Sequence, residues 1–375
     1  MTEGASDRQT FDTLNGMRGI AALAVAMMHF QWFLSGFHPA IVSVAVDFFF
    51  VLSGFVIAYA YSAELAAGLP RRHFLLARFI RLYPMFVAGL ALGMAAILLY
   101  QPPQSDAAFW GNVAFNFAML PFPLEYPAAN DDLFPLNFPA WSLFFELVAY
   151  TLFALFLPRL GRRGLAVLVA AGFVGLVLTG LSEATLDRGV WRPSWPGGLA
   201  RVTFCFFAGV ALHRLWQARP TRIALHPAAL FALLAAPLLW RPQPDLPWAW
   251  LYELAVVTLW MPLMVWLGTG SVAGGGWRRL CEVLGAVSYP LYIVHAPLVI
   301  IAINFNGRQG DAFFKTHAPW AGFAFIAALV LLAWLLARFV DLPVRRTLAR
   351  KFLPGRTRHA TEVERADTGD PLSAP

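Results

Sequence analysis

Long apolar runs recur from one end of the 375-residue sequence to the other, and they restrict the possible folds more than any other feature. Hydrophobic residues make up 59% of the chain and charged residues 13%, whereas about a quarter of the residues in a soluble domain are charged. A helix crosses a bilayer with about 20 mostly apolar residues. The sequence therefore predicts an all-α, polytopic integral membrane protein with about ten transmembrane helices. The ten runs lie at residues 14–35, 43–61, 84–100, 139–157, 165–182, 199–216, 225–240, 248–268, 284–303 and 319–340.

The basic residues between these runs predict the orientation in the membrane. With the N-terminus in the cytoplasm, 22 of the 28 lysines and arginines fall in or beside cytoplasmic segments. The other six lie on or near the outside: Arg188, Arg192, Arg201, Arg241, Arg308 and Lys315. This asymmetry follows the positive-inside rule, so we expect a multi-pass protein of a bacterial-type inner membrane with both termini cytoplasmic. The net charge of +7 is dispersed in short clusters, so we expect no nucleic-acid partner, and an oligomer is left open.

Three segments are expected from composition: a cytoplasmic tail over residues 1–13, a transmembrane domain over 14–346, and a largely disordered cytoplasmic tail over 347–375. Arg18 interrupts the first apolar run and no small-residue cleavage site follows it, so we expect this run to stay as an anchor. The two cysteines, Cys205 and Cys281, predict neither a disulfide framework nor a metal site.

The first apolar run, residues 14–34, carries Arg18 and His29. An ionisable residue inside a spanning helix is costly, and its default interpretation is functional. Eleven residues at about 100° each end about 20° from a whole number of turns, so both side chains point off one face, about 16 Å apart along the axis. The alternative for His29 is a hydrogen bond to a neighbouring helix. We favour a buried, neutral imidazole that can accept a proton as a general base.

Two carboxylates are expected at about the depth of His29. Asp47 opens the second run, and its carboxylate either fixes the tautomer of His29 or caps its own helix. Glu146 lies about 10 Å into the fourth run if that helix enters from outside near Pro139. Three ionisable groups at one level on three helices favour a shared polar cavity. Gly54, in the second run, is expected at a close helix contact.

Arg78 and Arg81 form an R-x-x-R pattern at the predicted cytoplasmic surface, ahead of a third span that we expect to begin near Pro84. Three residues apart, both guanidinium groups lie on one helix face and suit phosphate groups. Anionic lipid headgroups would satisfy the same pair, so a soluble ligand and a lipid both stay open.

Two further features lie towards the predicted outer side. Residues 101–138 form a long segment rich in Pro and Phe, which is expected either to cover the outer mouth as a partial lid or to rest on the headgroups. His295 lies near the middle of the ninth run. We expect it either to form a second polar wall of the cavity or to be a core histidine whose hydrogen bonds are made inside the bundle.

Five blocks in order resemble the membrane-bound acyltransferase 3 family of polysaccharide and antibiotic O-acyltransferases. The resemblance extends from about residue 12 to residue 346. The blocks are LNGMRGIAALAVAMMHF with its R-x10-H, VDFFFVLSGF, ARFIRLYP with its R-x-x-R, WSLFFE, and SYPLYIVHAP. Asn15 stands where the family commonly has Asp, and Leu147 where a second Glu often follows Glu146.

This resemblance implies ten spans, a cytoplasmic acyl-CoA donor and transfer of the acyl group to a hydroxyl of a sugar. The group that the family commonly transfers is acetyl, so acetyl-CoA is the expected co-substrate. It implies essential roles for Arg18 and His29 and donor handling by Arg78 and Arg81. No bound cofactor and no metal is implied. The candidate cavity-lining residues, from the second, fourth and ninth runs, are Ser53, Trp141, Tyr292 and His295.

We therefore expect a membrane O-acyltransferase in which His29 acts as general base or carries the acyl group, with Asp47 or Glu146 orienting it. Arg18, Arg78 and Arg81 are expected to bind acyl-CoA, and the acceptor is expected to be a carbohydrate. The rival hypothesis is a secondary transporter or flippase whose intramembrane ionisable groups form a relay.

Overall fold

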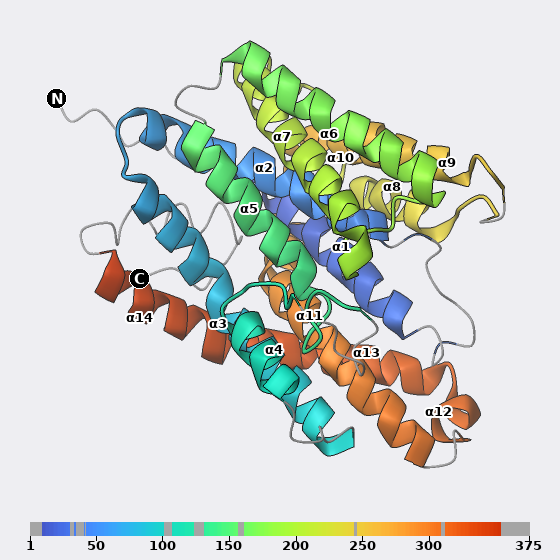
Figure 1. The fold of residues 1–375 in the computed structure, drawn as a ribbon. Helices are drawn as coiled ribbons and strands as arrows, with labels where there is room; N and C mark the ends of the chain where they lie inside the picture. Colours follow the sequence, from blue (N-terminus) through green and yellow to red (C-terminus); the bar gives the residue numbers. More distant parts are fainter. Residues whose placement is uncertain are drawn as a thin grey trace.

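The computed structural model describes residues 10–30, 34, 41, 43–100, 107–123, 131–156, 161–243, 246–308 and 312–353. These residues form helices and connecting segments, and the β-type pairing among them is one isolated bridge between Asp132 and Trp191. Figure 1 shows the helices gathered into one bundle. The all-α prediction is confirmed. The largely disordered tail was predicted over residues 347–375, but a helix continues to Phe352, and the residues beyond 353 lie outside the described part of the chain.

The helices in chain order are α1 (Asp12–His29), α2 (Ser43–Ala66), α3 (Arg71–Tyr100), α4 (Ala107–Phe117), α5 (Ala140–Phe156), α6 (Arg162–Glu183), the 3₁₀ turn η4 (Arg192–Ser194), α7 (Trp195–Ala218), α8 (Pro227–Leu239), α9 (Ala249–Ala255), the π-helical turn η5 (Val256–Trp260), α10 (Met261–Thr269), α11 (Gly275–Arg308), α12 (Ala312–His317), α13 (Trp320–Leu336), the π-helical turn η6 (Ala337–Asp341) and α14 (Leu342–Phe352).

Seven helices in the described part of the chain are long and apolar enough to cross a membrane, so the multi-pass prediction holds while the count of ten is not confirmed. The other three predicted spans correspond to α1, α5 and α8, with 18, 17 and 13 residues. Polar residues such as Asn15 and Arg18 lower the hydropathy of α1. At about 1.5 Å per residue, α8 is about 20 Å long, which is shorter than the hydrocarbon core.

Helix α3 differs from the prediction at its start. The third span was expected to begin near Pro84, but α3 begins at Arg71 and continues through Pro84 for 30 residues. Proline is tolerated inside membrane helices because neighbouring helices satisfy the backbone groups around it. In this case the Tyr289 hydroxyl of α11 donates to the carbonyl of Leu82. Arg78 and Arg81 therefore lie inside a continuous helix and not on a separate surface segment.

Two close helix pairs organise the bundle. Helix α1 packs along α11, and α2 packs along α7 (Figure 1). A Cβ atom at Gly54 would lie 1.9 Å from the Phe206 carbonyl oxygen, and one at Gly209 would lie 2.0 Å from that of Val51. The backbones of α2 and α7 thus approach each other at two glycines, as expected for Gly54.

The described end of the long outer segment packs against the bundle. Phe134, Leu136 and Asn137 are buried, and Asn137 Nδ2 donates to the carbonyl of Ile293 on α11 at 2.8 Å. Of the two expectations for residues 101–138, this favours a partial cover over a loop on the headgroups. Residues 101–106 and 124–130 lie outside the described part of the chain.

Candidate functional site

A cavity of about 100 Å³ lies between α1, α2, α3, α5 and α11. Five residues predicted from sequence line it: Arg18, Ser53, Arg81, Glu146 and Tyr292. The sequence analysis did not single out four further polar residues that line it: Ser142, Tyr150, Ser288 and Tyr289. Helix packing thus joins side chains that lie up to 274 positions apart in the sequence.

Hydroxyl groups hold Glu146 at the wall of this cavity. Its Oε1 atom accepts hydrogen bonds from Ser53 Oγ and from the Tyr150 hydroxyl, both at 2.6 Å. Tyr150 lies one turn after Glu146 on α5, and Ser53 comes from α2. Glu146 is therefore tied to the cavity, and it makes no hydrogen bond to His29.

Two arginines bring positive charge to the cavity. Arg18 donates from Nε to Ser288 Oγ at 3.0 Å and from Nη2 to the carbonyl of Gly285 at 3.3 Å, so α11 fixes its guanidinium group. Arg81 lies over the ring of Tyr289 at 5.1 Å, with Nη1 3.9 Å from Asp341 Oδ2. Two guanidinium groups on one small cavity can attract an anionic ligand.

Arg78 lies apart from this cavity. It is buried, donates from Nη2 to the Tyr61 hydroxyl at 3.0 Å and stacks over the Tyr61 ring at 5.0 Å. The R-x-x-R pattern thus places Arg81 at the cavity and Arg78 against α2. Asp341, the partner of Arg81, also pairs with Arg345 at 3.0 Å, a cluster that the sequence did not predict.

His29 and His295 are neighbours, with ring centroids 5.0 Å apart. The Nδ1 atom of His29 lies 2.9 Å from the Val25 carbonyl oxygen, and that of His295 lies 2.7 Å from the Tyr292 carbonyl oxygen. A carbonyl only accepts, so each Nδ1 is assigned as the donor, and a neutral ring keeps its Nε2 lone pair. His295 Nε2 is buried without a hydrogen-bond partner among the described residues.

Tyr292 lies between the cavity and the two histidines. Its hydroxyl shares a hydrogen bond with Ser142 Oγ at 2.8 Å, and its ring lies 5.9 Å from that of His295. Phe138, from the outer segment, closes the other side of His29 with ring centroids 5.1 Å apart. His295 is not among the residues that line the cavity, but its ring contacts place it beside His29 and Tyr292.

The predicted pairing of Asp47 with His29 is wrong. Asp47 is fully buried and forms a two-point ion pair with Arg201 of α7, with Nε to Oδ1 at 3.0 Å and Nη2 to Oδ2 at 2.9 Å. Matching depths fix a level in the membrane but not the direction in which a side chain points. The close contact of α2 with α7 brings Arg201 to Asp47, and a buried carboxylate needs a paired cation.

Trp141 also takes a different place from the one expected. The guanidinium group of Arg201 lies over its ring at 5.1 Å, and Trp141 is not among the residues that line the cavity. Arg201 was interpreted as an orientation signal of the outer side. Its position within the apolar run of α7 was the signal that could have identified it as a buried partner.

No cluster of three or more His, Cys, Asp or Glu side chains suited to a metal ion occurs within the described ranges. The described residues form a polar cavity that Arg18 and Arg81 line, with the imidazoles of His29 and His295 beside it.

Comparison with known proteins adds the family. The family described as "Acyltransferase domain" matches residues 11–338. "Exopolysaccharide production protein ExoZ" of Rhizobium meliloti is 26% identical over 335 residues, which cover 88% of this chain and 98% of that protein. "Putative membrane-bound transacylase BcsY" of Komagataeibacter xylinus is 26% identical over 352 residues, 86% of this chain and 80% of that protein.

A third relative is more similar over a shorter stretch. "Protein 2 in picA locus" of Rhizobium radiobacter is 39% identical over 187 residues, which cover 46% of this chain and 96% of that protein. No solved structure matches. The family match covers most of the chain and includes every helix that contributes to the cavity. The chain belongs to the acyltransferase 3 family of membrane acyltransferases.

Proposed function

We propose that the protein moves an acetyl group from cytoplasmic acetyl-CoA to a hydroxyl group of a cell-surface polysaccharide, a lipid-linked sugar or a glycolipid. The observation that carries this proposal is the arrangement of Arg18 and Arg81 on one small cavity, which Tyr292 joins to the pair of imidazoles. The carbohydrate acceptor is supported by the name of the ExoZ relative, which refers to exopolysaccharide production. The proposed setting is an inner membrane with both termini in the cytoplasm.

The size and charge of the cavity suit the reacting end of acyl-CoA. A volume of about 100 Å³ suits a short acyl group, which favours acetyl over long acyl chains. Arg18 and Arg81 supply the cations that phosphate groups require. Arg78 does not line the cavity. Its hydrogen bond to the Tyr61 hydroxyl holds α3 against α2, and it thereby positions Arg81. These three residues make up the proposed acyl-CoA site.

His29 is the proposed general base. The bond from Nδ1 to the Val25 carbonyl leaves Nε2 as the acceptor, and Nε2 takes the proton of the acceptor hydroxyl as its oxygen attacks the thioester carbonyl. The new C–O bond forms, the C–S bond breaks, and the imidazolium returns the proton to the CoA thiolate. His295 lies within ring contact of His29 and is the proposed second wall of this step.

Transfer from labelled acetyl-CoA tests the proposal. Membranes carrying the protein are mixed with surface polysaccharide, or with the glycolipid fraction, each extracted from cells that lack the gene. The wild type should label one fraction and release free thiol in equal amount. His29→Ala should lower the rate at least a hundredfold, because general-base catalysis contributes about 10²–10⁴.

A matched histidine provides the control. His317 is exposed on α12, so His317→Ala should keep wild-type transfer. Wild-type transfer by His29→Ala would overturn the role of His29. Flux of a sugar across the membrane without thiol release would overturn acyl transfer and favour a transporter.

A further inference from the structure

A second pocket of about 400 Å³ lies near the His29 end of α1. Met28, the neighbour of His29, belongs to its wall, and none of its lining residues belongs to the cavity described above. Its polar lining residues come from the start of α2, the end of α6 with the α6–α7 connection, the segment after α8 and from α9: Ser43, Glu183, Thr185, Asp187, Arg188, Arg241 and Glu253. All four places face the predicted outer side of the membrane.

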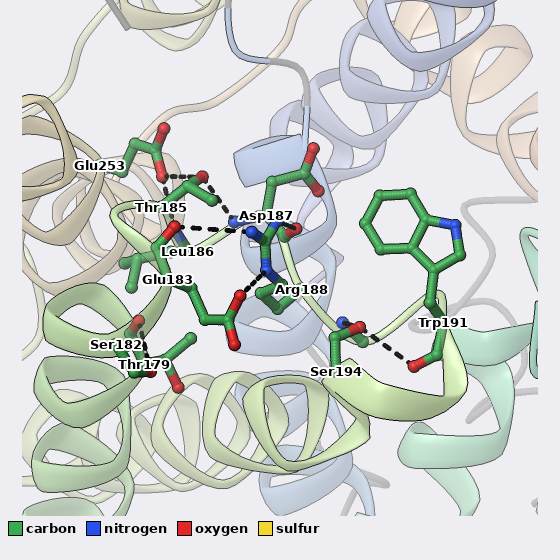
Figure 2. A network of polar contacts seen from close by, with 11 residues as sticks. Thr179, Ser182, Glu183, Thr185, Leu186, Asp187, Arg188, Trp191, Ser194 and Glu253 are labelled. Atoms are coloured by element: carbon green, nitrogen blue, oxygen red, sulfur yellow. Dashed lines mark hydrogen bonds and ion pairs between the residues drawn. The ribbon is translucent and has the colours of Figure 1, made fainter. Parts of the chain in front are cut away.

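The α6–α7 connection, which lines this pocket, is held by a network of polar contacts (Figure 2). Glu253 of α9 accepts hydrogen bonds from Thr185 Oγ1 at 2.9 Å and from the Leu186 backbone N–H at 2.6 Å. Arg188 donates to Glu183 Oε2 at 3.0 Å. The Arg188 carbonyl accepts from Arg201 Nη1 at 2.9 Å, so the buried ion pair with Asp47 also holds this wall.

Two charged side chains at this pocket take no part in holding it. Neither the carboxylate of Asp187 nor the guanidinium group of Arg241 forms a hydrogen bond or an ion pair with another residue that the structure describes. Both side chains are half-buried. The Asp187 carboxylate can thus accept, and the Arg241 guanidinium group can donate, hydrogen bonds to a ligand in this pocket, which Met28, the neighbour of His29, also lines.

We infer that this pocket binds the sugar unit that receives the acyl group, with Asp187 and Arg241 as its specificity-determining residues. This inference rests on the proposed function. Sugar hydroxyl groups both donate and accept hydrogen bonds. A carboxylate, which accepts, and a guanidinium group, which donates, can therefore bind them. A volume of about 400 Å³ lies within the range of about 300–1,000 Å³ typical of small-molecule sites. The sugar enters from outside, while the donor enters from inside, and the two substrates meet at His29.

Separate KM values for the two substrates test this inference. With the fraction that the wild type acetylates, Asp187→Asn and Arg241→Gln should each raise the KM for the sugar acceptor at least tenfold. The KM for acetyl-CoA should stay within twofold in both variants. A matched control is Arg222→Gln, which changes an exposed residue outside the pocket and should keep both KM values.

A labelling experiment gives a second readout that does not depend on turnover. Cys205 and Cys281 are buried, so a membrane-impermeant maleimide should react with Ala184→Cys, at an exposed position that lines the pocket, and hardly with the wild type. The accepted sugar fraction should slow this reaction, whereas acetyl-CoA alone should not. The inference is overturned if either charge variant keeps the wild-type KM for the sugar, if both KM values rise together, or if the sugar gives no protection. Absence of transfer by the wild type would instead overturn the proposed function on which it rests.

Discussion

At the scale of single residues, the pair of Asp47 and Arg201 is the main correction to the predicted chemistry. Arg201 reaches Asp47, the carbonyl of Ser43 at 2.7 Å, the carbonyl of Arg188 and the ring of Trp141. It therefore ties α2, α5, α7 and the α6–α7 connection together. Such a group stabilises the arrangement of the site without touching the reacting atoms.

This assignment predicts the behaviour of Asp47 variants. Asp47→Ala leaves the guanidinium group of Arg201 buried without its counter-ion, which should destabilise the protein by about 3–5 kcal/mol. Replacing both partners, as in Asp47→Leu with Arg201→Met, should recover much of that stability, because the desolvation cost of both charges disappears. Thermal unfolding in detergent and acetyl transfer would be measured together. Recovered stability with no recovered transfer would contradict a purely structural role for Asp47.

At the scale of elements, the segment over residues 131–139 connects the outer surface to the site. Asp132 forms the isolated bridge with Trp191, and Phe138 of the same segment contacts His29. The pKa of Asp132 is raised from 3.8 to about 7, mainly by burial and also by the charge of Asp131, while the charge of Arg192 opposes this rise. The way this segment packs should therefore depend on pH.

The sign of that dependence follows from the raised pKa. Below about pH 4 Asp132 is protonated in both the folded and unfolded states, and its contribution to stability is fully present. Between about pH 4 and 7 the unfolded chain loses the proton more readily, so stability is lost as the pH rises, by a few kcal/mol at most because Asp132 is half-buried. Relative to Asp132→Asn, the wild type should thus lose melting temperature from pH 4 to 8. A difference between the two proteins that stays constant over this range would contradict the packing described for Asp132.

At the scale of the whole molecule, the two pockets differ in the predicted side of the membrane that they approach. Arg18 and Arg81 lie at the end of the first cavity that faces the predicted inner side, and the pocket with Asp187 and Arg241 lies among the predicted outer connections. Helix α1 runs from the first towards the second, with His29 at its C-terminal end. The proposed transfer of an acyl group from a cytoplasmic donor to an acceptor on the outer side requires this arrangement in space.

Single cysteines test the orientation on which this view depends. Ser182→Cys, at the end of α6, should react with a membrane-impermeant maleimide in intact cells. Arg222→Cys, between α7 and α8, should react only after the membrane is opened. Both native residues are exposed, so access to the reagent and not burial decides the result. Reaction of both variants in intact cells, or of Arg222→Cys alone, would contradict cytoplasmic termini.

The sequence by itself determined the fold class and the residue types at the site. Apolar length and the rarity of charge predict a helical membrane protein, because backbone polar groups in lipid must pair within a helix. The cost of burying Arg18, His29 and Glu146 marked them as functional candidates. Helical period placed Arg18 and His29 on one face, and the structure has them on one helix, with Arg18 at the cavity and His29 beside it.

Only the tertiary structure decided which of these side chains meet. Asp47 and His29 were predicted at similar depths, yet Asp47 pairs with Arg201 across the close contact of α2 with α7 at two glycines. The rotation of a helix about its axis is set by packing and not by sequence position. Packing likewise separated Arg78 from Arg81 and brought Asp187, from a connection with no motif, into the pocket that Met28 also lines. Contacts between distant segments depend on how whole helix surfaces fit, and this information is not present in any one stretch of the chain.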